Sequence, residues 1–148
     1  MKHSLLTHTL LVAIAAGTAT SALASSVSVD NCWIRAMPPS VPSVAYFTLK
    51  NDGDAAASLS SVSTPAFGMA MLHETITDAG TSKMVHIDSA SIPAHGALAF
   101  APKGYHVMLE KPVQTLMVGA KTPMQFRFAD GASVQAECEV KPASFTGK

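Results

Sequence analysis

The stretch MQFRFADGASVQAECEV, residues 124–140, decides the fold class. Met124, Phe126 and Phe128 alternate with Gln125 and Arg127, and a second apolar and polar alternation follows an Asp-Gly pair. A period of two puts the apolar side chains on one face of a strand and the polar side chains on the other. Asp-Gly between two such runs is a strong hairpin signal. The stretch therefore predicts a β-hairpin with one face in a core.

The same signals continue outward along the chain from residue 25. Short apolar runs alternate with turn residues rich in proline, glycine, asparagine and aspartate, and no run has a convincing helical period. This alternation of short apolar runs with turn residues predicts an all-β sandwich. We expect strands near residues 27–36, 43–50, 57–63, 69–77, 82–88, 97–101, 105–110, 123–129 and 132–140.

Residues 1–24 are typical of a secretory signal peptide. Lys2 supplies a weak positive start, an apolar run covers Leu10–Ala16, and Ala22-Leu23-Ala24 matches a small-residue cleavage site. We expect export, cleavage after Ala24 and a single β-sandwich domain over residues 25–148. Residue 25 is serine, so we expect no lipid anchor and no stable association with a membrane.

Composition argues against several classes of function. The chain has 10 basic and 10 acidic residues, and removal of Lys2 with the signal leaves it close to neutral. This balance gives no electrostatic reason to expect nucleic acid as a partner. There is no nucleophile-elbow motif, no glycine-rich phosphate loop and no obvious pair of catalytic carboxylates. We expect a monomer that is not an enzyme.

The chain has two cysteines, Cys32 and Cys138, which fall in the first and last expected strands. In an exported protein with no third cysteine, a disulfide is the natural interpretation. It requires the two strands to be neighbours. Otherwise the cysteines remain two buried free thiols.

A second informative stretch, residues 73–108, contains histidines and methionines at fixed spacing. His73, Met84, His106 and Met108 form the pattern H-x10-M-x21-H-x-M. Alternation in residues 105–109 assigns the residues on either side of His106 to the core. His106 and Met108 then stand on the opposite face, roughly 6 to 7 Å apart along the strand.

Alternation in the two preceding expected strands has the same consequence. It turns His73 and Met84 away from the core, together with their neighbours Met71 and His86. Methionine normally packs in protein cores. Packing therefore does not explain why methionines recur outside the core in these strands. The residues assigned to the core in these strands are Leu72, Ile76, Val85 and Ile87.

The types of donor narrow the metal that such a site would hold. Imidazole and thioether, without thiolate or carboxylate, favour Cu(I) over Zn²⁺, Ca²⁺, Mg²⁺ or Mn²⁺. Thioethers need no deprotonation and survive in an oxidising compartment better than thiolates. The pattern thus agrees with an exported Cu(I)-binding protein.

The motifs resemble the PCu(A)C family of periplasmic copper chaperones. The resemblance lies in the H-x10-M-x21-H-x-M spacing, in Lys83-Met84 and in Gly104–Met108. The segments Trp33–Ser40 and Phe128–Val134 resemble the flanking regions of that family. The resemblance covers nearly all of the chain after residue 24.

This resemblance implies a cupredoxin-like Greek-key β-sandwich. It also implies one Cu(I) per monomer, held by His73, Met84, His106 and Met108, and delivery to the copper centre of cytochrome c oxidase. The partners would be a copper-accepting oxidase subunit, a thiol-disulfide copper chaperone, or both. The chain ends without the Met- and His-rich tail of some relatives, which favours one site.

Several nearby residues have two interpretations. Met71 is an auxiliary ligand or lid, or it packs on a neighbouring strand. His86 orients a ligand or binds Cu(II), or it is a solvated surface histidine. Met37 lines the rim of the site or packs in a loop, while we expect His95 on the surface and Trp33 in the core. The methionines expected only to pack are Met69, Met117 and Met124.

Other functions compete with delivery of Cu(I). The same ligands would serve copper storage or resistance, and a metal-free interaction module would make them incidental. A blue-copper electron carrier needs a cysteine thiolate with two histidines and a weak axial ligand. No histidine or methionine follows Cys138, which argues against that class.

Overall fold

A computed structural model describes residues 26–147, and in this range the chain forms ten strands and no helix. Each of the nine expected strands is present, with ends within two residues of the expected positions. The additional strand is β6, which has only three residues. The strands are β1 (Val27–Arg35), β2 (Ser43–Asn51), β3 (Ala57–Ser63), β4 (Phe67–Asp78), β5 (Thr81–His86), β6 (Ala90–Ile92), β7 (Gly96–Phe100), β8 (Tyr105–Pro112), β9 (Lys121–Phe128) and β10 (Ser133–Lys141).

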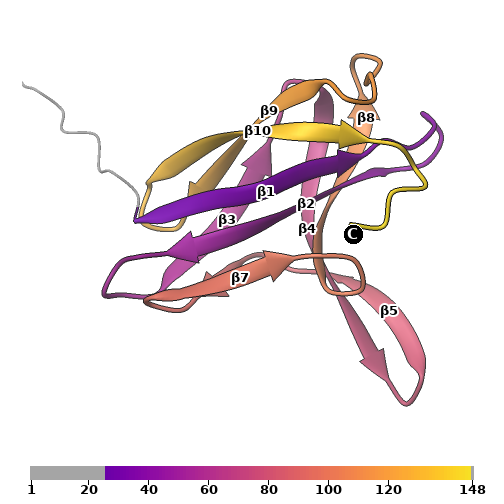
Figure 1. Cartoon of the computed structure of the whole chain (residues 1–148). Coiled ribbons are helices and arrows are strands. Elements are labelled where there is room, and N and C mark those ends of the chain that lie inside the picture. Colours follow the sequence, from indigo (N-terminus) through magenta and orange to yellow (C-terminus); the bar gives the residue numbers. More distant parts are fainter. Residues whose placement is uncertain (1–25, 148) are drawn as a thin grey trace, which may run out of the picture.

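The strands form one hydrogen-bonded sheet in the order β5-β4-β8-β7-β2-β1-β10-β9-β3-β6, with a further pairing of β8 to β2. The sheet folds over on itself, so β1, β2 and β10 lie in front of β3 and β4 (Figure 1). The result is the expected cupredoxin-like β-sandwich. No helix among the described residues is long and apolar enough to cross a membrane.

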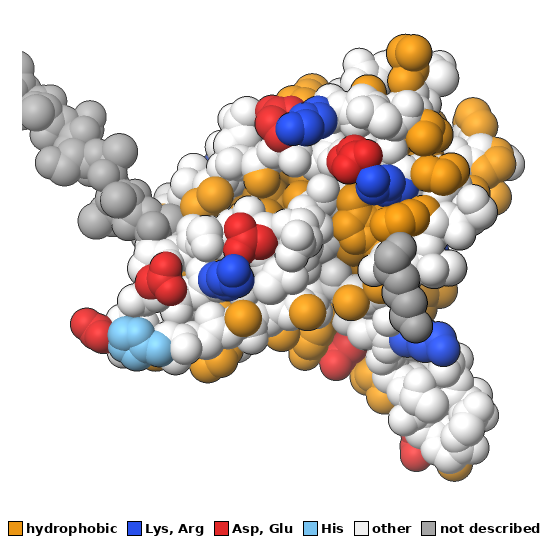
Figure 2. Space-filling view, in the orientation of Figure 1, with side chains coloured by type: hydrophobic (Ala, Val, Ile, Leu, Met, Phe, Trp, Pro, Cys, Tyr) orange, Lys and Arg blue, Asp and Glu red, His pale blue; other side chains and the backbone are white. Residues whose placement is uncertain are grey.

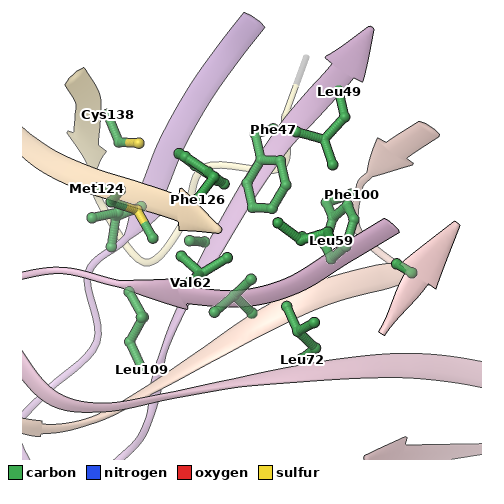
Figure 3. Packing of buried hydrophobic residues seen from close by; sticks show 14 of the residues in the cluster. Phe47, Leu49, Leu59, Val62, Leu72, Phe100, Leu109, Met124, Phe126 and Cys138 are labelled. Carbon is green, nitrogen blue, oxygen red and sulfur yellow. The ribbon is translucent and has the colours of Figure 1, made fainter. Parts of the chain in front are cut away.

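The core lies between the two layers. Three aromatic rings from three strands meet there, with the Phe47 ring centroid 4.4 Å from that of Phe100 and 4.7 Å from that of Phe126. Figure 3 shows these rings among aliphatic side chains from both layers. Met124 is fully buried, as expected from the alternation in β9. The hairpin of residues 124–140 is therefore structural scaffold.

Two further features tie the sandwich together. Cys32 and Cys138 form a disulfide between the parallel strands β1 and β10, which confirms the expected pairing. At the end of β2, the buried Asn51 amide donates to the carbonyl oxygens of Ala55, Ile92 and Pro93. Its side-chain oxygen accepts from the Gly53 amide and from a serine hydroxyl. One amide thus connects β2 to two loops.

The β4–β5 hairpin extends beyond the body of the sandwich (Figure 1). In the space-filling view it stands out from the body, and most of its visible surface is neither hydrophobic nor charged (Figure 2). Ile76, which alternation assigns to the core, is instead 45% exposed. The prediction for Ile76 was wrong because the hairpin continues past the layer that would have covered it.

Candidate metal centre

The pairing of β4, β5 and β8 brings the histidine and methionine pattern onto one face of the sheet. His73 on β4 lies opposite His106 on β8 and, on its other side, opposite His86 on β5. Cross-strand partners in an antiparallel pair point to the same face. Met108 likewise lies opposite Met71. Three strands therefore present imidazoles and thioethers side by side.

His106 is the most buried of these residues. Strand β8 lies between β4 and β2 in this part of the sheet, and His106 is only 5% exposed. Its Nδ1 lies 3.0 Å from the carbonyl oxygen of Gly104, while its Nε2 is buried without a hydrogen-bond partner among the described residues. A carbonyl only accepts, so Nδ1 carries the proton and Nε2 keeps a free lone pair in the neutral ring. Such an unpaired atom is what a metal ligand requires.

His73 is arranged in the same way. Its Nδ1 lies 3.3 Å from the carbonyl oxygen of Met71, two residues earlier, just as His106 uses the carbonyl two residues before it. A hydrogen bond at Nδ1 fixes the tautomer and leaves Nε2 free for a metal. The rings of His73 and His106 are 5.8 Å apart between centroids and tilted by 20°. The two free nitrogens therefore belong to neighbouring rings.

The two methionines differ in exposure. Met108 is half-buried on β8, two residues from His106 and therefore on the same face. Met84 lies opposite Thr75 on the edge strand β5, and it is 62% exposed. Thr75 is two residues from His73, so Met84 lies on the same face of the sheet as the histidines. The four residues lie on one face of the sheet, which is buried at His106 and open to solvent at Met84.

A metal ion on this face would need more than one kind of donor atom. Within residues 26–147, no group of three or more histidine, cysteine, aspartate or glutamate side chains could hold a metal ion. Both cysteines form the disulfide and cannot act as thiolates. A metal centre on this face therefore has to combine imidazole nitrogen with thioether sulfur, and that donor set suits Cu(I).

An aromatic and cationic cluster continues the same outer face on β1 and β2. Trp33, which we expected in the core, is half-buried outside it, with its ring centroid 4.4 Å from Tyr46 and 4.9 Å from Phe145. The Arg35 guanidinium lies over both Trp33 and Tyr46. Burial raises the pKa of Tyr46, and Arg35 partly offsets this rise. This cluster fixes the chain after β10 against β1.

The remaining candidates have simpler positions. Met37 lines a groove of about 610 Å³ at the end of the sandwich, between the loop after β1 and the end of β8. Met117, which we expected to pack, is instead 73% exposed. His95 is an exposed loop residue whose Nε2 lies 2.8 Å from the Asp54 carboxylate, as expected for a surface histidine. Met69 is half-buried on β4.

The strand spacing predicted the face of each candidate ligand but not its neighbours on the adjacent strands. Sequence reasoning did not identify His86 as the partner directly opposite His73, nor Met71 as the partner of Met108. The only available signal was that both share the parity of a ligand on the same strand. The burial of His106 and the carbonyl oxygens beside the Nδ1 atoms of His73 and His106 were likewise not predictable from spacing.

Comparison with known proteins places the chain in a family. The family model LpqE-like, described as "Putative lipoprotein LpqE-like", matches residues 27–140. The chain belongs to the LpqE-like family. One relative of this LpqE-like chain is "Putative lipoprotein Lxx21020" of Leifsonia xyli subsp. xyli. It is 32% identical over 122 residues, which cover 82% of this chain and 73% of the relative.

Solved structures similar to this LpqE-like chain include copper-bound forms. The solution structure of apo-DR1885 from Deinococcus radiodurans is 30% identical, covers 96% of this chain and 97% of its own, and has a TM-score of 0.62. The structure of CuI-DR1885 is 28% identical over 88% of this chain and 85% of its own, with a TM-score of 0.64. The copper-bound PCuAC domain from PmoF2, at 21% identity and a TM-score of 0.67 over 80% of this chain and 94% of its own, shares the fold.

Proposed function

We propose that this protein is a periplasmic metallochaperone that binds one Cu(I) through His73, Met84, His106 and Met108. The observation that carries the proposal is the buried Nε2 of His106, which has no hydrogen-bond partner within residues 26–147. It belongs to a ring beside that of His73, whose Nδ1 is the nitrogen next to the Met71 carbonyl. Burying such a nitrogen unpaired is costly. A bound cation on this face would make use of its lone pair.

The donors suit Cu(I) as cargo. Two neutral imidazoles and two neutral thioethers hold a monovalent ion without adding negative charge. The carbonyls of Met71 and Gly104 hold the rings in the tautomer that a metal needs. DR1885, a relative of similar length, has been solved in a Cu(I) form, which supports the same cargo for this chain.

The openness of the site supports a carrier over an enzyme. Met84 is the outermost ligand, on an edge strand, and an acceptor can approach it from solvent. Transfer of Cu(I) would begin when a ligand of the acceptor replaces Met84. The bond between Cu(I) and the buried His106 would break last. No bond is made or broken apart from those to the metal.

We further propose export and delivery. The expected signal peptide, residues 1–24, lies outside the described residues. The acceptor is the copper centre of cytochrome c oxidase, reached through an oxidase subunit, a thiol-disulfide copper chaperone, or both. The disulfide Cys32–Cys138 agrees with an oxidising compartment.

A deletion strain grown with limiting copper tests delivery. We expect it to lose cytochrome c oxidase activity and to regain it with the wild-type gene or with added copper. The Met84→Leu/Met108→Leu gene should fail to restore activity although its protein accumulates. If oxidase activity is normal in the deletion strain while its copper tolerance falls, the protein stores copper and the delivery proposal is wrong.

A further inference from the structure

The C-terminal segment, residues 142–147, folds back after β10 over the outer face of β1 (Figure 1). The Phe145 amide donates to the Pro142 carbonyl, which turns the chain. The Phe145 ring meets Trp33 edge-on, with 4.9 Å between the ring centroids. Its carbonyl oxygen accepts from the Nε of Arg35 at 3.1 Å. The segment is therefore held to β1 by one ring contact and one hydrogen bond.

The end of the C-terminal segment reaches the turn that joins β7 to β8. A β-carbon placed on Gly147 would lie 3.2 Å from Cζ2 of Trp33 and 3.9 Å from the ring of Pro102. Phe145 and Pro102 also line the same cleft, which has a volume of about 420 Å³. The segment thus packs between β1 and this turn.

The turn itself needs support from its surroundings. The Gly104 amide donates to the Ala101 carbonyl at 3.0 Å and closes a turn of four residues. Its third residue, Lys103, has a φ of 71°, a left-handed conformation that residues other than glycine rarely adopt. Such a conformation persists only where neighbouring contacts hold it. The packing of Pro102 near the C-terminal segment is one such contact.

The last residue of the turn holds the ring of His106. The Gly104 carbonyl accepts from His106 Nδ1 at 3.0 Å and from the Thr75 amide at 3.1 Å. His73 depends instead on the carbonyl of Met71, which lies within β4. A shift of the turn would therefore move the hydrogen-bond acceptor of His106 and leave that of His73 in place.

The C-terminal segment also supports the side of the site that β2 provides. Tyr46 lies two residues after Val44, the partner of Met108, so its side chain lies on the same face as Met108. Tyr46 is only 5% exposed, and its ring centroid is 4.4 Å from that of Trp33. Because Phe145 packs on the same Trp33 ring, the segment helps to keep this cover in place.

We propose that Phe145 is a positioning residue for the Cu(I) site. Its contact with Trp33 keeps the C-terminal segment against Pro102. The supported turn then holds the Gly104 carbonyl where it fixes the tautomer and the orientation of His106. This inference rests on the proposed function, because it takes His106 as a ligand. Phe145 acts through these neighbours and does not touch the metal.

The test uses Phe145→Ala, with Ser144→Ala as the matched control because Ser144 is its exposed neighbour in the same segment. Arg35→Lys is a second variant. It keeps the positive charge but removes the planar guanidinium, including the Nε that donates to the Phe145 carbonyl. Heteronuclear NMR of the apo-proteins measures the tautomer of each histidine ring. Competition with a chelator measures Cu(I) affinity.

We expect Phe145→Ala and Arg35→Lys to shift the ring nitrogens of His106 toward the average of the two tautomers, while those of His73 stay unchanged. Cu(I) affinity should fall at least about tenfold, because loss of a group that orients a ligand commonly costs 10- to 100-fold. Ser144→Ala should match the wild type in both measurements. A general loss of stability would not single out one of the two rings.

Three results would overturn the positioning role. They are an unchanged His106 ring in the folded variants, equal changes at His73 and His106, and an unchanged Cu(I) affinity although the His106 ring has changed. If Phe145→Ala does not fold, Arg35→Lys gives the answer by the same measurements. The tautomers are measured without copper, so a wild type that binds no Cu(I) contradicts the proposed function separately.

Discussion

Replacing His106 by leucine should remove copper binding while leaving the apo-protein as stable as before, or more stable. In the wild type, Nε2 is buried without a partner in the part of the chain that the structure describes, which costs about 1–3 kcal/mol of folding free energy. Leucine has a similar volume and no polar atom. It gives up the hydrogen bond from Nδ1 to the Gly104 carbonyl, which contributes about 0.5–1.5 kcal/mol.

The Gly104 carbonyl does not become unpaired in this variant, because it also accepts from the Thr75 amide at 3.1 Å. The two contributions together predict that the unfolding free energy of apo His106→Leu differs from that of the apo wild type by about −0.5 to +2.5 kcal/mol, with a stabilising mean. Most substitutions at buried positions destabilise by about 1 kcal/mol or more, so the expected sign is unusual.

Urea denaturation of the apo-proteins, followed by circular dichroism, measures this difference. Repeating it with free Cu(I) at 100 times the dissociation constant should add about 2.7 kcal/mol to the wild type and nothing to His106→Leu. His86→Leu is the control, because that exposed ring has no buried unpaired atom, and its apo stability should change by no more than about 0.5 kcal/mol. The reasoning is refuted if apo His106→Leu is less stable than the wild type by more than about 1 kcal/mol.

Three further predictions concern the scaffold. Cys32→Ser/Cys138→Ser removes the disulfide between residues 106 positions apart and should lower the unfolding free energy by about 3–5 kcal/mol in urea. A loss below about 1 kcal/mol would contradict a stabilising role for the disulfide. Asn51→Ala removes an amide that hydrogen-bonds to two loops and should lower the unfolding free energy by about 2–4 kcal/mol in the same assay. An unchanged unfolding free energy would show that these hydrogen bonds do not stabilise the fold. Burial raises the pKa of Tyr46, so the unfolded chain loses this proton first, and stability should fall as the pH rises above 10.0, the unperturbed value. Tyr46→Phe should reduce that fall in denaturation curves recorded across alkaline pH, and an unchanged slope would refute the assignment.

Local patterns predicted most of the sandwich because each strand carries its own alternation. The hairpin of residues 124–140 needed nothing beyond its period and its Asp-Gly turn. Strand β6 was missed because three residues, Ala90–Ile92, are too few to show a period. Trp33 was misplaced because β1 has apolar residues on both faces, so parity alone could not tell which face the core would take.

The candidate site was predictable as a set of residues but not as an arrangement. Spacing assigned His73, Met84, His106 and Met108 to one kind of face. It could not give the register of β4 against β5 and β8, because that depends on contacts between strands far apart in sequence. The position of His86 opposite His73, and the burial of His106 by its neighbouring strands, follow from that register.

The most direct test of the account is a Cu(I) titration against a competing chelator, with the wild type beside Met84→Leu/Met108→Leu. Leucine keeps the apolar volume of methionine and removes only the sulfur donor, so the variant should stay folded by circular dichroism. We predict that the wild type binds one Cu(I) per chain and that the folded variant loses this binding. Equal Cu(I) binding by both proteins, or none by the wild type, would contradict the proposed ligand set.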